Sequence, residues 1–540
     1  MDLCCVRNLS CARPTVNMKP MQVEVVLVSG KRALIDVTAG TTLSDLKRLA
    51  QRGLGVWRGR LLNQTGEEMD GERTVQQAGL QANDILQMLI RPTFLASNLS
   101  AFAAILGDGS AVAWGDPACG GDSTPVQASL RNVSQIIGTY AAFAAILDDG
   151  SVVTWGHELS GGSSSEVQSL LSDVKQIQAT GYAFAAILDC GSVVTWGHPD
   201  CGGDSRHVQQ QLWDVTQIQS TAFAFAAIRM DGCIVTWGNN GYGGALPHAA
   251  EARGVQQLQS SAGTFVAIKQ DESLLVWGNL ARTAQSRAIP EGLRHVKQVQ
   301  AANFLDEGAF AAVLADGSVA TWGDAECGGD SSAVRQLLRN VRQVQSTQTA
   351  FAAIREDGSV VTWGHPHGGG DSSDVQQQLQ HVQQIHCTSY QRRDGAFAAI
   401  LQDGSVVTWG SFMCGGNSRK VQDQLRKVRQ IQATRCAFAA LLEDGSVVTW
   451  GQRPGGGDSS AVQKQLKDVR QIQATAYAFA ALRADGSIVT WGSVTSGGDS
   501  SSIREELRAE ADEAGHRMGY HASEGPPCPD FAPLLNSSEV

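Results

Sequence analysis

A Trp-Gly pair recurs ten times along this 540-residue chain, and no other feature constrains the fold as strongly. Seven of the nine intervals between pairs are 40 or 41 residues, and two are 45 or 46. The tryptophans concerned are Trp114, Trp155, Trp196, Trp237, Trp277, Trp322, Trp363, Trp409, Trp450 and Trp491. A fixed period of this length is typical of repeat proteins, in which one unit cannot bury its apolar faces alone. Ten units therefore fill residues 93–502.

Each unit predicts three strands. In the last unit, residues 469–475 alternate apolar and polar residues, which indicates a half-buried strand. Residues 478–482 and 487–491 then flank Asp485-Gly486, a strong hairpin signal because glycine accepts a positive φ. Eight units carry Asp-Gly at this turn and one carries Cys-Gly, whereas the fifth has Asp271-Glu272 and is expected to turn differently. The two long intervals contain extra residues before the Ala-Phe run, which indicates loop insertions.

The two hairpin strands are apolar on both faces, as in AFAAI and SVVTW. Strands of this kind belong to sheets that are covered on both sides. The repeated tryptophans are expected to fill the space between sheets, with the indole N–H bonded to a carbonyl oxygen. We therefore assign them a structural role, with a ligand-binding aromatic ring as the alternative.

A Gly-rich loop, typically GGDSS, follows each Trp-Gly pair. Val462, Leu466 and Val469 lie at i, i+4 and i+7, which predicts a short helix or 3₁₀ turn leading to the next unit. A column of aspartates at the loop is expected to cap these turns, with an acidic rim that binds basic peptides or calcium as the alternative. Its members are Asp122, Asp204, Asp330, Asp371, Asp458 and Asp499. Three histidines, His157, His198 and His365, follow Trp-Gly and are read as surface-loop residues.

The repeat resembles that of the regulator of chromosome condensation (RCC), a β-propeller blade. The resemblance rests on the apolar strand, Asp-Gly, a second apolar strand ending in Trp-Gly, and a Gly-rich loop. It departs in two ways: GGDSS replaces the usual Gly-Gln-Leu-Gly, and the short period is similar to the three-stranded blades of β-lactamase-inhibitory propellers. The resemblance implies a mainly β, propeller-like array of ten blades. A closed ring, seven blades plus three, and an open stack are all compatible with the repeat, and we favour one continuous array.

Residues 21–91 do not share the period and predict a separate α+β module. A hairpin around Ser29-Gly30, a capped helix with Leu43, Leu46 and Leu49, and two further strands follow in order. This order resembles ubiquitin, a β-grasp fold, most closely from residue 60 through 74 to 85–89. The resemblance implies a partner-binding apolar patch at Val28, Leu62 and Leu89. The alternative is that they are ordinary surface residues of a sheet.

The chain continues through Arg91-Pro92, where ubiquitin ends in Gly-Gly. We therefore expect a built-in ubiquitin-like domain and not a conjugated modifier. Residues 1–20 and the end of 503–540 read as disordered tails, the second beginning with an acidic, helix-like stretch. Cys4, Cys5 and Cys11 in the first tail are expected to be ordinary reduced thiols, with lipidation as the alternative.

Composition excludes several classes of function. The net charge is −11, from 42 Lys and Arg against 53 Asp and Glu, which argues against a nucleic-acid-binding surface. There is no run of apolar residues long enough for a membrane span, no clean secretory signal and no CxxC zinc-site spacing. We expect no metal and no cofactor. A cytoplasmic, or alternatively nuclear, protein is the default expectation.

No P-loop, nucleophile elbow or other catalytic motif occurs in the chain. We therefore predict a non-enzymatic interaction scaffold that contacts ubiquitin receptors or ligase components through the first module. The array would bind an unidentified protein, and the variable loops of units four and five are candidates for that contact, with decayed copies as the alternative. A competing hypothesis is guanine-nucleotide exchange on a small GTPase, which the RCC resemblance implies. Acceleration of labelled-GDP release would distinguish the two.

Overall fold

The computed structural model describes residues 20–54, 56, 59–69, 71–246, 253–279, 289–290, 293–304, 307–389 and 393–503. The predicted tails therefore lie almost entirely outside the described residues, as do Cys4, Cys5 and Cys11 and parts of the variable loops of units four and five. Within the described residues, no helix combines the length and the apolar character needed to cross a membrane.

The N-terminal module is one helix and a four-stranded sheet. Its elements are β1 (Met21–Leu27), β2 (Arg32–Val37), α1 (Leu43–Leu54), β3 (Arg60–Leu62) and β4 (Ile85–Leu89). The strand order is β2-β1-β4-β3, with β1 and β4 parallel and the other pairs antiparallel.

The predicted helix of this module begins as its sequence indicates. The hydroxyl of Thr42 accepts a hydrogen bond from the Asp45 N–H at 3.1 Å, which satisfies a backbone donor that the helix itself leaves unpaired. The expected apolar face is partly wrong, because Leu49 is 38% exposed whereas Ala50 is buried. The buried face is therefore Leu43, Leu46, Ala50 and Leu54.

Ten consecutive three-stranded antiparallel sheets follow, and these confirm the predicted array of ten blades. The first strands are β5 (Phe94–Ser97), β8 (Val133–Gly138), β11 (Val174–Ala179), β14 (Val215–Ser220), β17 (Val255–Ser260), β20 (Val296–Phe304), β23 (Val341–Ser346), β26 (Val382–Ser389), β29 (Val428–Ala433) and β32 (Val469–Ala474). The second strands are β6 (Ala101–Ile105), β9 (Ala142–Leu147), β12 (Ala183–Leu188), β15 (Ala224–Arg229), β18 (Thr264–Lys269), β21 (Glu307–Leu314), β24 (Ala350–Arg355), β27 (Gly395–Leu401), β30 (Ala437–Leu442) and β33 (Ala478–Arg483). The third strands are β7 (Ala111–Gly115), β10 (Val152–Gly156), β13 (Val193–Gly197), β16 (Ile234–Gly238), β19 (Leu274–Gly278), β22 (Val319–Gly323), β25 (Val360–Gly364), β28 (Val406–Gly410), β31 (Val447–Gly451) and β34 (Ile488–Gly492). The extra residues of the two long intervals extend the hairpins β20–β21 and β26–β27, as expected for insertions.

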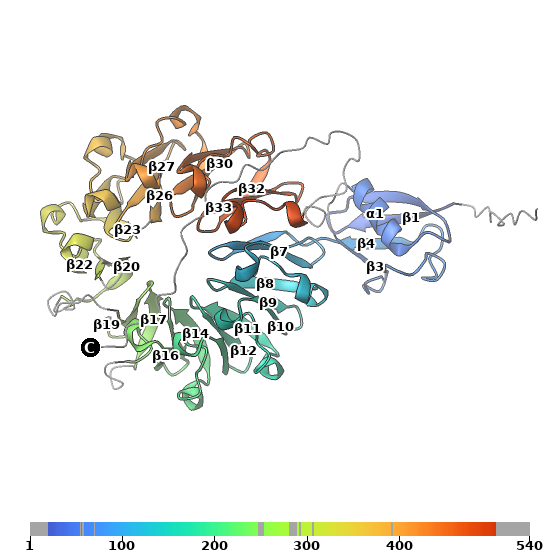
Figure 1. Ribbon diagram of the computed structural model, residues 1–540, viewed down its shortest axis with the longest axis horizontal. Coiled ribbons are helices and arrows are strands. Elements are labelled where there is room, and N and C mark those ends of the chain that lie inside the picture. The colour runs from blue at the N-terminus through green and yellow to red at the C-terminus, as the bar shows by residue number, and fades with distance from the viewer. Residues whose placement is uncertain are drawn as a thin grey trace, which may run out of the picture. The chain divides into compact units, whose positions relative to one another are not determined.

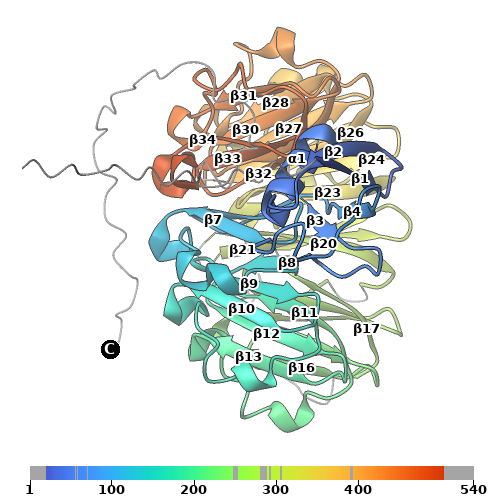
Figure 2. The same cartoon turned by 90° about the vertical axis from the view of Figure 1, so that its right-hand side faces the viewer.

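The blades pack face to face around a ring (Figure 1). Each apolar cluster joins the alanine-rich strand of one blade to the Phe and Trp of the next, and ten such clusters run from blade 1 to blade 10. The tenth cluster joins the last blade back to the first, through Ala478 and Ala480 against Phe102 and Trp114. Blades 1 and 10 are therefore neighbours, and the array is a closed ring and not an open stack. Figure 2 shows the same ring from the side, with the blade strands stacked beside one another.

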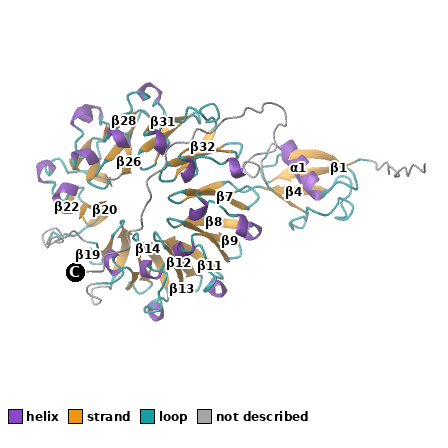
Figure 3. Cartoon of the chain, viewed as in Figure 1, coloured by secondary structure: helices purple, strands orange, loops and turns teal. Residues whose placement is uncertain are grey.

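Short 3₁₀ turns connect the blades (Figure 3). Seven lead into a following blade or close the last one, in the region where a helical turn is predicted: η2 (Thr124–Ser129), η4 (Gln168–Leu170), η6 (Gln209–Gln211), η10 (Ser332–Val334), η12 (Ser373–Gln378), η14 (Gln422–Gln424) and η17 (Ser501–Ile503). A second set directly follows the Trp-Gly pairs and was not predicted: η1 (Pro117–Cys119), η3 (Glu158–Ser160), η5 (Pro199–Cys201), η7 (Asn240–Tyr242), η9 (Ala325–Cys327), η11 (Pro366–Gly368), η13 (Phe412–Cys414), η15 (Arg453–Gly455) and η16 (Val494–Ser496). A left-handed glycine ends each turn of this second set, which explains the first Gly of the GGDSS loop.

The fifth blade turns in the same way as the others, which corrects the prediction for Asp271-Glu272. Glu272 takes a positive φ of 64°, close to the 74–85° of the glycines at this turn in the other blades. The carboxylate of Asp271 still accepts from the N–H and hydroxyl of Ser273. The surrounding sheet therefore holds Glu272, a residue with a Cβ, in the left-handed region. The backbone strain there costs roughly 1–2 kcal/mol.

Replacing Glu272 by glycine is expected to raise the free energy of unfolding by about 0.5–1.5 kcal/mol, because glycine removes this backbone strain. The substitution also removes an exposed ion pair with His295, and exposed pairs contribute only about 0–1 kcal/mol. Glu272→Ala is the control, since it loses the pair but keeps a Cβ. Urea unfolding measures both variants, and a glycine variant no more stable than the alanine variant contradicts the strain argument.

Candidate functional site

The structure brings the predicted patch residues Val28, Leu62 and Leu89 to one face of the N-terminal sheet. Leu61 and Met88 point into the core, so their neighbours Leu62 and Leu89 face outward and are half-buried. Val28 follows β1 directly, in the hairpin turn, and is 84% exposed. These residues belong to or adjoin three adjacent strands, β1, β4 and β3.

Strand register places Val28 and Leu89 at the same end of the parallel pair. Leu27 pairs with Met88 across β1 and β4, and Val28 and Leu89 are the next residue on each strand. Leu62 lies on β3, opposite Gln87 of β4. The geometry is that of a small apolar surface, and its binding role stays a prediction.

The ten repeated tryptophans lie inside the blade interfaces, each at most 5% exposed. Each stacks on the phenylalanine opposite it on the neighbouring strand, with ring centroids 5.2–5.4 Å apart. Nine donate the indole N–H to the carbonyl of a glycine in the preceding blade, as at Trp155 and Gly120 (3.0 Å). The Trp322 N–H finds no partner among the described residues. Packing accounts for the whole column.

The aspartate column caps turns. Each of the six carboxylates accepts from the backbone N–H two residues further on, at 2.8–3.0 Å. At Asp204, hydrogen bonds from the Arg206 guanidinium and then from the Arg206 backbone N–H stabilise the carboxylate and lower its pKa to about 2. Among the described residues, no three His, Cys, Asp or Glu side chains gather as a metal site.

The three histidines that follow Trp-Gly, and Cys119 and Cys201 in the loops after it, show no sign of an activated nucleophile or base in the described residues. His157, His198 and His365 each precede a 3₁₀ turn and make no capping side-chain bond to it. Burial raises the pKa of the Cys119 and Cys201 thiols to about 11, which keeps them protonated and weakly nucleophilic.

Sequence reasoning missed a belt of glutamines along the middle of the ring. The first strands of successive blades contact one another, so these strands are the innermost (Figure 1). Their buried positions face the blade core, and the intervening positions face the axis. Nine blades carry glutamine at the first of two axial positions: Gln135, Gln176, Gln217, Gln257, Gln298, Gln343, Gln384, Gln430 and Gln471. Seven carry it at the second: Gln178, Gln219, Gln259, Gln300, Gln345, Gln432 and Gln473.

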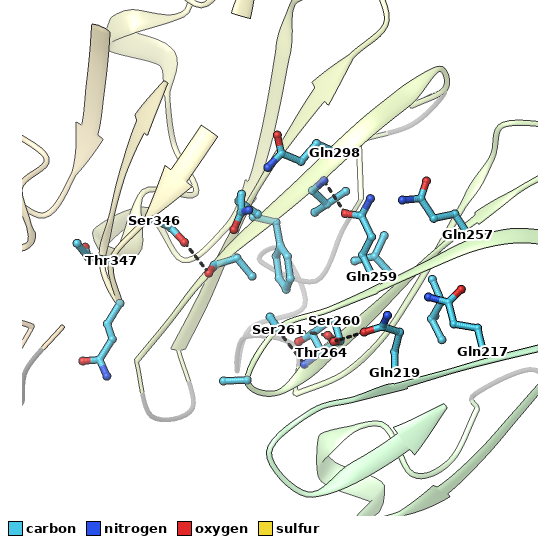
Figure 4. A pocket seen from close by; sticks show the side chains of 18 residues that line it. Gln217, Gln219, Gln257, Gln259, Ser260, Ser261, Thr264, Gln298, Ser346 and Thr347 are labelled. Atoms are coloured by element: carbon cyan, nitrogen blue, oxygen red, sulfur yellow. Dashed lines mark hydrogen bonds between the residues drawn. The ribbon is translucent and has the colours of Figure 1, made fainter. Parts of the chain in front are cut away.

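A cavity of about 700 Å³ opens on this belt between blades 4 and 7. The side chains of Gln217, Gln257, Gln259 and Gln298 come together there from three neighbouring first strands (Figure 4). The signal that could have revealed it is the motif Val-x-Gln-Ile-Gln, which repeats with the same period as the tryptophans. Alternation alone correctly identifies a half-buried strand but does not show that the polar sides converge.

Comparison with known proteins adds no family assignment. No protein-family model matches the chain, and no curated protein sequence matches it. Solved structures that resemble it in part include Prp20p from Saccharomyces cerevisiae, at 14% identity over 67% of this chain and 83% of that one (TM-score 0.32). The ectodomain of the Physcomitrella patens receptor kinase CR4 matches at 13% identity over 51% and 73% (TM-score 0.30). The designed protein Ika8 matches at 13% identity over 59% and 96% (TM-score 0.28). At these scores the fold rests on the hydrogen bonding and packing of this chain itself.

Proposed function

We propose that this protein is a non-enzymatic interaction scaffold, in which the N-terminal module docks on components of the ubiquitin system and the propeller holds a second protein. The observation that carries the proposal is the outward-facing apolar group Val28, Leu62 and Leu89 on a small sheet. A single exposed apolar side chain needs no explanation, but three that share one face across adjacent strands favour a partner that covers them together.

The resemblance to ubiquitin indicates which class of partner would dock on this surface. Partners of ubiquitin grip an apolar patch on its sheet, and the three matching positions here are all apolar. Membership of the RCC-type repeats belongs to the same proposal, and it gives the propeller an expected role in binding protein. No specific residue on the described part of the ring favours nucleotide exchange over simple binding.

Replacing Leu62 by alanine is expected to weaken binding of a ubiquitin receptor to the full chain by about tenfold or more. Central apolar contacts of an interface commonly contribute at least about 1.4 kcal/mol, which corresponds to that factor. Isothermal titration with a panel of isolated ubiquitin-binding domains measures the effect.

The matched control is Leu34→Ala. Leu34 is 65% exposed on the edge strand β2, on the same outward face, and it pairs with Glu24 in the middle of the hairpin. We expect this variant to bind within about twofold of the unaltered chain. The docking proposal fails if no domain of the panel binds at about 1 mM, or if Leu62→Ala and Leu34→Ala behave alike.

A further inference from the structure

Among the described residues, none that lines the cavity on the glutamine belt carries a charge. Eighteen residues line it, all of them Gln, Ser, Thr, Ala, Leu, Val or Phe. This is unusual in a chain with 95 charged residues, 42 basic and 53 acidic. A ligand held inside this cavity would therefore be uncharged where it is buried, because an unpaired charge loses its hydration there.

Three glutamines of the lining have side-chain amide atoms without a partner among the described residues. Gln217, which is half-buried, and Gln257, which is exposed, make no side-chain hydrogen bond to those residues, and Figure 4 shows no interaction drawn to either. The Oε1 of Gln348 is buried in the lining and likewise unpaired among the described residues. Buried polar atoms are normally satisfied, so this one unpaired acceptor points to a group supplied from outside, whereas Gln217 and Gln257 are open to solvent and to a ligand.

Other glutamines of the same belt have structural roles. Gln259 accepts from the Val299 N–H of the next blade at 2.9 Å, and Gln298 donates to the Val344 carbonyl at 3.4 Å. These bonds tie neighbouring first strands together and hold the wall in place. The belt therefore contains both fixed amides and free ones, and the free ones are available to a ligand.

The spacing of the amides fits an extended peptide. Two glutamines two residues apart on a strand are about 6.8 Å apart, which is also the repeat of the N–H and C=O groups along one edge of an extended peptide. Each glutamine amide offers a donor and an acceptor, the same pair that a peptide unit presents. An extended peptide that lies along the first strand of a blade thus meets a glutamine amide at every second residue.

Blades 4 and 5 differ from the other blades in having both glutamines of the pair and no charged residue directly before it. Blades 4 and 5 carry Gln217 with Gln219 and Gln257 with Gln259, and the residue before each pair is Thr216 or Gln256. In blades 7 and 9 the residue before the pair is arginine, which donates to carbonyls of the next first strand. Blades 2 and 8 replace the second glutamine by Ile137 and His386, and blade 1 has neither glutamine.

We propose that this cavity binds an extended, uncharged polar peptide segment of a partner protein. The main-chain and side-chain amides of the peptide would exchange hydrogen bonds with the amides of Gln217 and Gln257 and donate to Gln348 Oε1. The proposal deepens the scaffold function, on which it rests, by giving the propeller its own site and class of ligand. It does not depend on docking by the N-terminal module.

The test is fluorescence anisotropy of the full chain with a labelled, capped octapeptide of serine, glutamine, asparagine and glycine. Gln217→Leu combined with Gln257→Leu is expected to weaken binding by at least about fivefold, since the hydrogen bonds of two amides to the peptide are lost together. Neither side chain bonds the described part of the protein, so the fold should persist. The matched control combines Gln430→Leu with Gln471→Leu, at the same repeat position but outside this cavity, and is expected to bind normally.

Each outcome bears on the proposal directly. Binding that is lost in the first double variant and kept in the control supports it, as does weaker binding of a peptide with two aspartates. No binding at about 1 mM, equal effects of the two double variants, or binding of maltohexaose in place of the peptide overturns it. The Leu62→Ala chain is expected to retain peptide binding, which separates this proposal from the docking of the N-terminal module.

Discussion

Replacing Gly197 by alanine is expected to lower the free energy of unfolding by about 3–5 kcal/mol, the sum of backbone strain and steric overlap. Gly197 ends β13 with a φ of +103°, which residues with a side chain rarely adopt. A Cβ there would lie 2.6 Å from the Tyr182 carbonyl oxygen and 2.8 Å from the Cα of Ala183. Both atoms are backbone of the neighbouring strand and cannot move aside without distorting the sheet.

The same glycine position recurs in all ten blades, with φ between 96° and 119°. The control for Gly197→Ala is Gly254→Ala, where φ is +69° and no described atom lies within 4 Å of the added Cβ. Other blades carry Asn, Asp, His or Lys at the position of Gly254, also with positive φ, so a side chain is tolerated there. We expect this control to cost about 1–2 kcal/mol in urea unfolding. Equal losses of unfolding free energy for the two variants would show that overlap between the added Cβ and the backbone of the neighbouring strand is unimportant.

These glycines explain why the repeat is so informative at the sequence level. The constant repeat length, the Trp-Gly pair and the Asp-Gly turn together identify a repeated unit. Its strands, its hairpin turn and its interface tryptophan all recur from blade to blade. The burial of Phe102 and Trp114 and the positive φ of Gly150 follow from local chemistry alone. Three strands per blade and a short turn between blades could therefore be predicted from the amino-acid sequence.

What could not be predicted depends on contacts between distant parts of the chain. The glutamine belt exists because first strands of successive blades converge, and alternation within one strand carries no information about that. Glu272 keeps a positive φ because its flanking strands pair as in the other blades, so tertiary structure overrides the local preference. For the patch, the resemblance to ubiquitin and not strand alternation singled out Leu62 and Leu89, and the structure places both on the outward face of the sheet. The partner that covers them does not follow from the resemblance.

Ring closure is the other feature that the repeat left open, and it rests on a seam between blades 1 and 10. No strand from one end of the array joins the sheet of the other, since β5-β6-β7 and β32-β33-β34 are separate sheets. The seam is held by the packing of Phe102 and Trp114 against blade 10. Hydrogen bonds that cross it include Trp114 Nε1 to the Gly497 carbonyl (3.2 Å), Ser97 Oγ to the Ala474 carbonyl (2.9 Å) and Ala476 N–H to the Leu99 carbonyl (3.0 Å).

Replacing Trp114 by alanine is expected to cost about 3–5 kcal/mol and to open this seam, because a fully buried indole and its hydrogen bond are lost together. Trp277→Ala is the matched control, since Trp277 is also fully buried, stacked and bonded, but lies between chain-adjacent blades. A short connection holds blades that are neighbours in the sequence near one another. Closing the seam instead joins residues that are 383 positions apart in the sequence, as between Trp114 and Gly497. Hydrogen exchange should therefore accelerate in β5–β7 and β32–β34 of the Trp114 variant below its unfolding transition, and not in those strands of the Trp277 variant. If protection at the seam is retained in both, the ring is held closed by contacts other than this tryptophan.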